Sequence, residues 1–396
     1  MGFAYKFCKF CEFFREDLSM IKFTLTPYDV LFFGSGRPFQ IGGVVASAFP
    51  PHPNTFASAI CAKINQIKNI KITNILKAVY GSFIKKDDKI YFPKPQNVYT
   101  ERKKKDVDKV FIVRPLGISL NLFKPENTNK PSKIQTFFVF KGSEEVEPFN
   151  AFISSNGLKK WLNNQEIGKE DVLEYKDIFI SEPRLGIKID DSLRSVGGKE
   201  DALYRIDFLR LKDDVSFVFW AEFDLLNSEL KKAGLDDEDK IFEFFNDEPR
   251  VLKLGGEMKN VRYEVEKNDF RKWIRDELKI KNIELKRGDK IEVLFLTYGV
   301  FDLTDDKLPK IKDFEIFSAC FGCYEVIGIN SVNLGRKTKR AFPPGTIMLL
   351  RKESDEKRMI DNPTFLVKKD GLYEMDNPIG TQEFIGTNLV LIKHGG

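Results

Sequence analysis

One arginine stands beside two glycines near the start of the chain, in the stretch Gly34-Ser35-Gly36-Arg37. Glycine lets the backbone approach a ligand closely, so backbone N–H groups and the Arg37 guanidinium can contact one phosphate together. The competing interpretation is a turn arginine that pairs with a carboxylate. We favour phosphate binding, with Gly36 and Arg37 as candidate ligands.

His52 and His394 are the two histidines of the chain. A histidine can serve as a general acid or base, which makes His52 the alternative catalytic candidate. However, His52 stands among prolines in Pro50-Pro51-His52-Pro53, and no second histidine accompanies it. We find no other catalytic group, because paired acids such as Asp87-Asp88 lack partners at a metal-site spacing.

Two cysteine pairs, Cys8/Cys11 and Cys320/Cys323, have a Cys-x-x-Cys spacing. This spacing allows both sulfurs of a pair to face one zinc ion, so two pairs could form a four-thiolate site. The pairs lie about 300 residues apart, and neither has the glycine and polar flanks of a zinc knuckle. We therefore expect reduced thiols, and no metal or cofactor.

Strands are the main elements that must position these residues. Residues 21–26 alternate apolar and polar side chains, which predicts a half-buried strand, and residues 30–33 continue it as an apolar run. Thr55 is expected to cap a helix. The apolar positions expected on one face of this helix are Phe56, Ile60, Ile64 and Ile67.

A long hairpin is predicted over residues 182–210, with Arg184 at its base and Arg194 at its tip. The competing interpretation of Arg184 is a bond to a loop carbonyl. Residues 216–223 form a near-continuous apolar run, which predicts a central strand. Helices are expected near residues 241–245 and 270–278. Strands alternate irregularly with helices, which favours an α+β fold with antiparallel sheets over a doubly wound parallel fold.

Composition sets broad limits on the fold and the partners. The 396 residues are enough for two domains, and 64 Lys and Arg against 59 Asp and Glu make a mildly basic chain. Few of the 37 phenylalanines are expected at the surface, where an exposed one could stack on an RNA base. No apolar run has the length of a transmembrane helix, and the start lacks a clean signal pattern, so we expect an intracellular, cytoplasmic protein.

Four stretches, in this order, resemble the RAMP proteins of CRISPR systems: Leu31–Phe39, Phe49–Thr55, Glu182–Arg210 and Leu254–Glu257. A fifth, Phe342–Thr346, is similar to the late proline-glycine turn of that family. More narrowly, the chain resembles the third subunit of the type III-B Cmr effector complex. It departs from the family at Gly34-Ser35, where relatives usually have Arg-Asp, and at residues 297–301, which lack the usual Gly-Trp.

The resemblance implies two ferredoxin-like domains, related to RNA-recognition motifs. The first would span residues 20–222, with an insertion at about 99–150 and the hairpin at about 182–210. The second would span residues 223–396 and contain a glycine-rich loop at 380–386. Residues 1–19 would be an N-terminal extension or the product of an upstream, non-native start.

The resemblance also implies a non-catalytic subunit that caps the 5′-tag end of the guide RNA. Its partners would be the large polymerase-like subunit and the backbone subunits, with no membrane contact. The alternatives are a metal-independent RAMP endoribonuclease and a zinc-stabilised scaffold. The residues expected to contact RNA are Gly36, Arg37, Phe39, Ser47, Arg184, Arg194, Lys337, Lys339, Arg340, Gly380 and Gly386.

Overall fold

The computed structural model describes residues 20–34, 44–102, 107–117, 136–140, 142–187, 203–257, 259–302, 309–331, 335–377 and 385–394. This part of the chain is rich in strands, and its ladders are antiparallel except for the short one between β2 and β13. The predicted α+β class with antiparallel sheets is therefore confirmed. Within the same residues, no helix is both long and apolar enough to cross a membrane.

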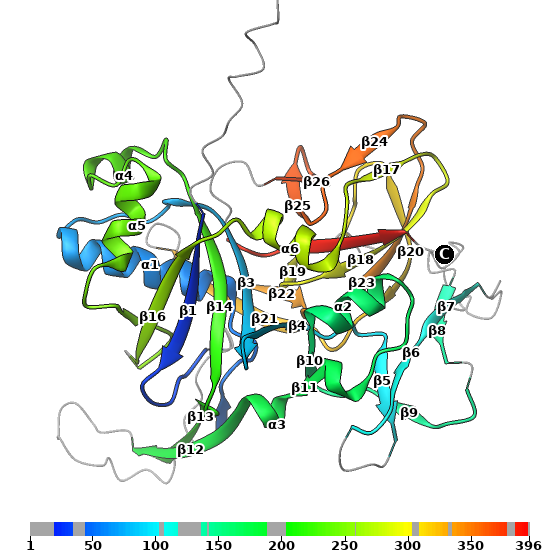
Figure 1. The fold of residues 1–396 in the computed structure, drawn as a ribbon, viewed down its shortest axis with the longest axis horizontal. Coiled ribbons are helices and arrows are strands. Elements are labelled where there is room, and N and C mark those ends of the chain that lie inside the picture. Colours follow the sequence, from blue (N-terminus) through cyan, green and yellow to red (C-terminus); the bar gives the residue numbers. More distant parts are fainter. Residues whose placement is uncertain are drawn as a thin grey trace, which may run out of the picture.

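The first of two large sheets has eight strands in the order β11-β10-β4-β3-β14-β1-β16-β15 (Figure 1). β14 lies between β1 and β3, and every residue of β14 except Ser216 is buried. Its continuous apolar sequence suits a strand that is covered on both faces. The strands are β1 (Met20–Pro27), β3 (Leu76–Lys86), β4 (Lys89–Pro93), β10 (Ala151–Ser154), β11 (Val172–Glu174), β14 (Val215–Phe223), β15 (Val251–Lys253) and β16 (Asn260–Lys267).

Three helices cover one face of the first sheet: α1 (Pro53–Lys68), α4 (Ser228–Lys232) and α5 (Glu238–Asn246). Aromatic rings form the centre of this layer. The ring of Phe219 on β14 lies 5.0 Å from that of Phe23 on β1 and 4.7 Å from that of Phe56 on α1. This packing fixes the start of α1 against the middle of the sheet.

The start of α1 differs from the prediction. The helix begins at Pro53, and its N-cap is His52, whose Nδ1 accepts a hydrogen bond from the Asn54 N–H at 3.2 Å. Thr55 therefore lies inside the helix. Three of the four predicted apolar positions are buried, but Ile67 is 52% exposed because it lies in the last turn, beyond the edge of the core.

The opposite face of the first sheet packs against α2 (Ser155–Leu162), α6 (Phe270–Leu278) and the second sheet. Trp220 of β14 is central here, with ring centroids 5.0 Å from both Phe270 and Trp273. The predicted helix at 270–278 is confirmed. Two short elements follow α2 along the chain, the 3₁₀ helix Lys169–Asp171 and α3 (Tyr175–Ile178).

The second sheet has six strands in the order β20-β23-β18-β27-β25-β26. Leu294, Ile347 and Leu391 of this sheet join the cluster that contains Tyr80 and Trp220 of the first sheet, so the two sheets share one core. The strands are β18 (Lys290–Phe295), β20 (Phe314–Cys320), β23 (Ile347–Lys352), β25 (Thr364–Lys369), β26 (Leu372–Asp376) and β27 (Leu389–His394).

Smaller sheets surround this core. The predicted hairpin is confirmed as β12 (Phe179–Ile187) paired with β13 (Leu203–Leu211), and it extends below the first sheet in Figure 1. β2 (Val44–Ala46) pairs with β13. The other small ladders are β17 (Ile283–Leu285) with β24 (Arg358–Ile360), β22 (Gly335–Phe342) with β19 (Gly299–Val300) and β21 (Glu325–Ser331), β5 (Val98–Glu101) with β6 (Val110–Ile112) and β9 (Val146–Glu147), and β7 (Arg114–Gly117) with β8 (Thr136–Val139).

Residues just beyond position 222 still belong to the first sheet. β16 pairs with β1, from Ile21 opposite Lys267 to Pro27 opposite Val261, and β15 pairs with β16. Leu254–Glu257 lies in the connection between β15 and β16. The expected domain division at 222/223 thus falls within β14, before its last residue Phe223, inside one hydrogen-bonded sheet.

Candidate nucleic-acid interface

The segment Leu31–Gly34, which leads toward Gly36 and Arg37, is held against the hairpin. It does not continue β1 as predicted, because β1 ends at Pro27 and Leu31 forms an isolated bridge to Leu209. Leu31 and Leu209 exchange two backbone hydrogen bonds of 2.8 Å. The Phe33 N–H donates to the Ser47 Oγ at 2.8 Å, and the Ser47 N–H donates to the Asp207 carbonyl oxygen at 3.1 Å. Ser47, a predicted RNA contact, therefore ties the segment Leu31–Gly34 to β13.

The connection between β15 and β16 also contacts the segment Leu31–Gly34. The Gly256 N–H donates to the Phe32 carbonyl oxygen at 2.8 Å. Gly255 has a φ of +74°, and a Cβ placed on it would lie 2.4 Å from that same oxygen. Only glycine fits there without displacing the backbone. The structure thus brings Leu31–Gly34, the hairpin and Leu254–Glu257 together, although they are far apart in the sequence.

Two arginines at the base of the hairpin form a network with two carboxylates. Arg184 Nη2 lies 2.7 Å from Glu182 Oε1 and 3.4 Å from Asp29 Oδ2. Arg210 Nε lies 2.6 Å from Glu182 Oε2, and its Nη2 lies 2.8 Å from Asp29 Oδ1. Arg184 lies at the base of the hairpin as predicted, but its partners are carboxylates and not a loop carbonyl.

This network balances its own charge. Hydrogen bonds from Arg210 and then Arg184 lower the pKa of Glu182, while the Val30 N–H and then the same arginines lower the pKa of Asp29. Both acids are therefore ionised at neutral pH. Each arginine is about two-fifths exposed, so a phosphate must compete with these carboxylates for either guanidinium.

Phe208 gives the network an aromatic base. The Arg184 guanidinium carbon lies 5.2 Å from the Phe208 ring centroid. Lys259, in the connection between β15 and β16, has its Nζ 5.3 Å from the same centroid. The centroids of the Phe32 and Phe208 rings are 5.8 Å apart. Sequence reasoning missed Asp29, Arg210 and Lys259, because no local pattern reveals contacts between such distant segments.

A second junction joins the proline-rich loop to the end of the chain. The Tyr298 hydroxyl oxygen lies 2.9 Å from the Pro50 carbonyl oxygen and 3.0 Å from Glu325 Oε2. Gly386 packs on the start of α1, where a Cβ placed on it would lie 2.6 Å from Pro53 Cβ. The predicted RNA-contacting end of the glycine-rich loop is thus fixed beside residues 50–53.

The basic strand β22 runs past this junction. Lys339 Nζ lies 2.9 Å from Asp302 Oδ1, and the pKa of Asp302 is lowered by hydrogen bonds from Lys368 and then Lys339. Arg340 is exposed. Lys337 is placed in β22 opposite Ile329, but its side chain lies outside the described part. Of the three predicted contacts here, Arg340 is the one that the structure places on the surface.

The sequence profile of the family described as CRISPR-associated protein (Cas_Cmr3) matches residues 23–394, nearly the whole chain. The chain belongs to this family. A comparison with curated protein sequences gives no match. The five stretches that carried the resemblance all fall within the matched range.

Solved structures similar to this Cmr3-family chain are distant. A chain of the type III-B Cmr-beta complex bound to cognate target RNA and AMPPnP is 17% identical, with a TM-score of 0.45 over 83% of this chain and 86% of that chain. A chain of the Csm3–Csm4 subcomplex of the type III-A CRISPR-Cas interference complex is 16% identical, with a TM-score of 0.36 over 91% and 98%. The family assignment therefore rests on the sequence match.

Several predicted residues of the Cmr3-family chain lie outside the described residues: Gly36, Phe39, Arg37, Arg194 and Gly380. Cys8 and Cys11 do so as well, while Cys320 is half-buried and Cys323 exposed. Among the residues that the structure describes, no three His, Cys, Asp or Glu side chains are grouped as a metal site would require.

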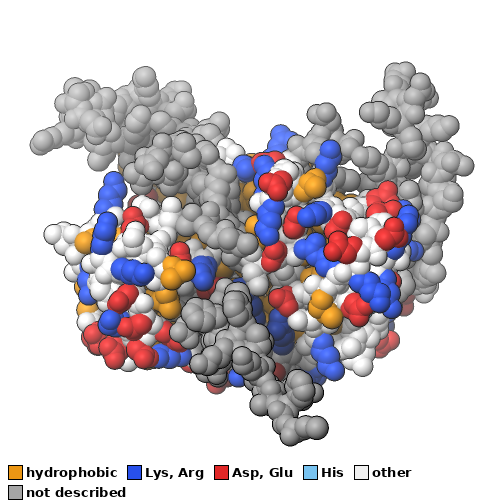
Figure 2. All heavy atoms as spheres, turned by 90° about the horizontal axis from the view of Figure 1, so that it is seen from above, with side chains coloured by type: hydrophobic (Ala, Val, Ile, Leu, Met, Phe, Trp, Pro, Cys, Tyr) orange, Lys and Arg blue, Asp and Glu red, His pale blue; other side chains and the backbone are white. Residues whose placement is uncertain are grey.

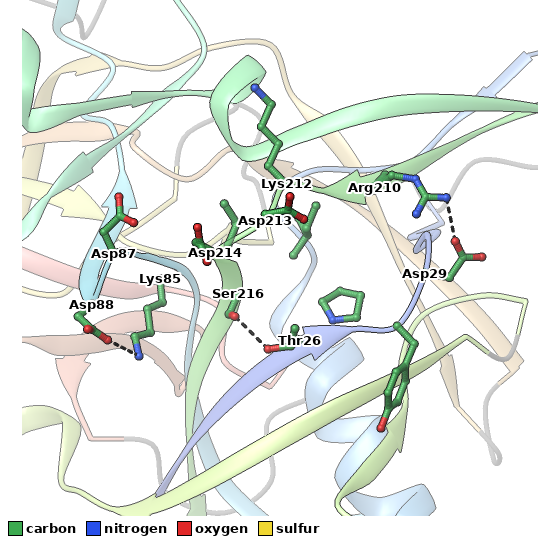
Figure 3. Close-up of a pocket in the computed structure, with 14 residues that line it drawn as sticks. Thr26, Asp29, Lys85, Asp87, Asp88, Arg210, Lys212, Asp213, Asp214 and Ser216 are labelled. Atoms are coloured by element: carbon green, nitrogen blue, oxygen red, sulfur yellow. Dashed lines mark hydrogen bonds and ion pairs between the residues drawn. The ribbon is translucent and has the colours of Figure 1, made fainter.

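Two views show how charge is distributed on the surface of the Cmr3-family chain. In Figure 2, lysines and arginines are interspersed with acids on the described surface of that face. A hollow of about 870 Å³ beside Arg210 is lined by five aspartates but only three basic residues (Figure 3). In that hollow Lys85 pairs with Asp88 at 2.8 Å. Its excess of carboxylates makes it unsuited to a phosphate backbone.

His52 gives a testable dependence of stability on pH. Burial lowers its pKa from 6.5 to about 3, so folding is favoured above pH 6.5 and this contribution is lost as the pH falls toward 3. His52→Asn keeps a capping oxygen and removes the titration. We expect the variant to lose less stability between pH 6 and 4, by up to about 1.4 kcal/mol per pH unit. Urea unfolding at several pH values measures this difference.

His394→Asn is the matched control, because it removes the other histidine from an exposed position at the end of β27. It should follow the wild-type dependence of unfolding free energy on pH. Identical slopes for wild type and His52→Asn would contradict the assignment of His52 as a neutral N-cap.

Proposed function

We propose that this chain is a non-catalytic, RNA-binding subunit of a type III-B CRISPR effector complex. It would cap the 5′-tag end of the guide RNA and bridge the large polymerase-like subunit to the backbone subunits. The observation that carries this proposal is the match of the family described as CRISPR-associated protein (Cas_Cmr3) over residues 23–394.

The geometry supports a single binding region. Direct hydrogen bonds join the segment Leu31–Gly34 to the hairpin and to the turn at Gly255. A site held in place by hydrogen-bonded strands suits recognition of RNA by phosphate contacts and shape. The balanced charge of the Arg184 network implies that Arg37 and Arg194, and not Arg184, carry the main phosphate contacts.

We also propose that both large sheets derive from the ferredoxin-like fold. In the first sheet, β3-β14-β1-β16 is the antiparallel order that a βαββαβ chain produces, and helices α1 and α5 lie on one face. In the second sheet, the strands β20-β23-β18-β27 follow the same order. The connections from β18 to β20 and from β23 to β27, where this fold has helices, contain none within the described residues. The division between the domains would then fall between α6 and β17.

The contacts of His52 favour the non-catalytic reading over the endoribonuclease. Its Nδ1 accepts the Asn54 N–H, and burial lowers its pKa to about 3. A general base works best with a pKa near the operating pH, and a general acid must carry its proton there. His52 meets neither condition near pH 7.

A gel experiment in EDTA tests both readings. The purified chain, co-expressed with the large subunit, is mixed with labelled guide RNA that carries or lacks its 5′ tag, and run on native and denaturing gels. We expect a tag-dependent shift with intact RNA. Equal affinity for the two RNAs would remove the capping role. Specific cutting that His52→Ala abolishes would replace the proposal by the endoribonuclease.

Arg37→Ala and Arg194→Ala test the phosphate contacts. Each should weaken guide binding roughly tenfold, since a charged hydrogen bond is lost, and should reduce the salt dependence of the affinity. Arg287→Ala is the control, because Arg287 is exposed and pairs with Asp355 at 3.0 Å in the second domain. If all three variants bind alike in salt titrations, the assignment of Arg37 and Arg194 is wrong.

A further inference from the structure

Three aromatic rings meet at the surface where β20 ends and β21 begins. The ring centroids of Phe321 and Tyr324 are 5.6 Å apart, and they lie 5.3 and 4.9 Å from the Phe342 ring on β22. Phe342 is buried, whereas Phe321 and Tyr324 are 40% and 37% exposed. The buried ring therefore holds two exposed rings in fixed positions.

Such exposure is unusual in this chain. Among the large aromatic side chains in the described ranges, Tyr28 is the other one that is strongly exposed. A phenylalanine at the surface loses the free energy that burial would contribute, about 2 kcal/mol. The pair therefore calls for a partner that covers it.

One basic side chain, that of Arg340, borders this aromatic pair. Side chains alternate along a strand, so Arg340 lies on the same face of β22 as Phe342, two residues away. Arg340 is exposed, and its charge acts on the Tyr324 hydroxyl, whose pKa is raised by burial and lowered by Arg340. Lys339 lies on the other face, where it pairs with Asp302, and Glu325 lies beside Tyr298.

We infer that Phe321 and Tyr324 form a stacking platform for unpaired RNA bases, with Arg340 at the adjacent phosphate. This inference rests on the proposed function and adds a site to it. Aromatic faces and a neighbouring guanidinium are the combination that holds single-stranded RNA without reading its sequence.

The size of the platform argues for bases and against a protein surface. A stable protein interface covers about 800 Å² on each partner. Of the other large apolar side chains that are exposed in the described residues, none belongs to β20, β21 or β22. Two rings beside an arginine match one or two nucleotides.

The platform also connects to the proposed RNA site. Tyr324 precedes Glu325, whose carboxylate lies 3.0 Å from the Tyr298 hydroxyl, and that hydroxyl contacts Pro50. The platform therefore lies close to the proline-rich loop that precedes α1, where Gly386 of the glycine-rich loop also packs.

Equilibrium titration of the full chain with fluorescent single-stranded guide RNA tests the platform. The double variant Phe321→Ala/Tyr324→Ala should bind at least about tenfold more weakly, with an unchanged slope of log affinity against log salt. Arg340→Gln should lower that slope. Phe321→Tyr/Tyr324→Phe keeps both rings and should bind like wild type.

Met359→Ala is the matched control, since it removes an exposed apolar side chain from β24 and should leave affinity unchanged. Wild-type affinity in the double alanine variant would overturn the platform and leave the proposed function intact. Absence of binding by the wild type would remove both. A double variant that keeps RNA affinity but loses a co-purified protein subunit would also overturn the platform, and reassign the rings to that subunit.

Discussion

Replacing Arg271 by methionine is expected to lower the free energy of unfolding by about 3–5 kcal/mol. Arg271 Nη2 lies 3.2 Å from Glu222 Oε2 between α6 and the first sheet, and the two side chains are only 13% and 5% exposed. The Tyr80 hydroxyl donates to the same carboxylate oxygen at 2.6 Å. Without the guanidinium, a buried negative charge keeps one neutral donor, which does not offset its lost hydration.

Urea unfolding measures this loss, and a double variant serves as its control. Glu222→Gln/Arg271→Met buries no net charge, so it should be more stable than Arg271→Met alone. Lys22→Met leaves Glu266 without its partner at 2.9 Å, but the Glu266 side chain is 58% exposed, so stability should change by less than about 1 kcal/mol. A loss of similar size in Lys22→Met and Arg271→Met would contradict the role of burial.

Gly255→Ala is expected to destabilise the chain by about 2–5 kcal/mol. Its positive φ disfavours any side chain, and the added Cβ would meet the Phe32 carbonyl oxygen at 2.4 Å. Because the Gly256 N–H donates a hydrogen bond to that oxygen, the segment Leu31–Gly34 would shift. We therefore also expect weaker binding of tagged guide RNA.

Gly234→Ala separates the two causes. Gly234 has a φ of +72° but no atom within 4 Å of the added Cβ, so this variant reports backbone strain alone, about 1–2 kcal/mol. Thermal or urea unfolding should rank Gly255→Ala below Gly234→Ala, and Gly234→Ala should bind RNA normally. Equal losses of unfolding free energy in the two variants would show that the close approach of the added Cβ to the Phe32 carbonyl oxygen does not destabilise the chain.

Local patterns predicted the elements well where a single physical factor decides them. The near-continuous apolar run of β14 and the four-residue spacing of Phe270, Ile274 and Leu278 each indicated the correct element. The start of α1 was misplaced because histidine is an uncommon N-cap, and Thr55 has the more usual side chain. Cap choice depends on which residue the turn before the helix brings into position.

Long-range pairing could not be predicted from these patterns. Nothing near Asp29 in the sequence indicates Arg184 or Arg210, which meet it because β1, β12 and β13 converge. For the same reason the division at 222/223 ignored β16, which returns to β1 after two helices. Such contacts depend on the whole sheet and leave no local signal.

The candidate site was likewise predicted only in part. The family resemblance selected the stretches that the structure joins around Phe32 and Pro50. It could not choose among 37 phenylalanines, because exposure of Phe321 depends on the packing of β20 to β22. Composition counts aromatic residues, whereas only packing decides which of them face a partner.

The position of β1 has a consequence for synthesis on the ribosome. β1 is the first described strand, yet its neighbours in the sheet are β14 and β16. Met20 pairs with Glu222, so about 200 residues must be translated before either edge of β1 is covered. Nascent chains shorter than this expose an apolar strand with two open edges. Truncated or slowly translated forms should therefore depend on chaperones, whereas in the full-length chain β14 and β16 cover both edges of β1.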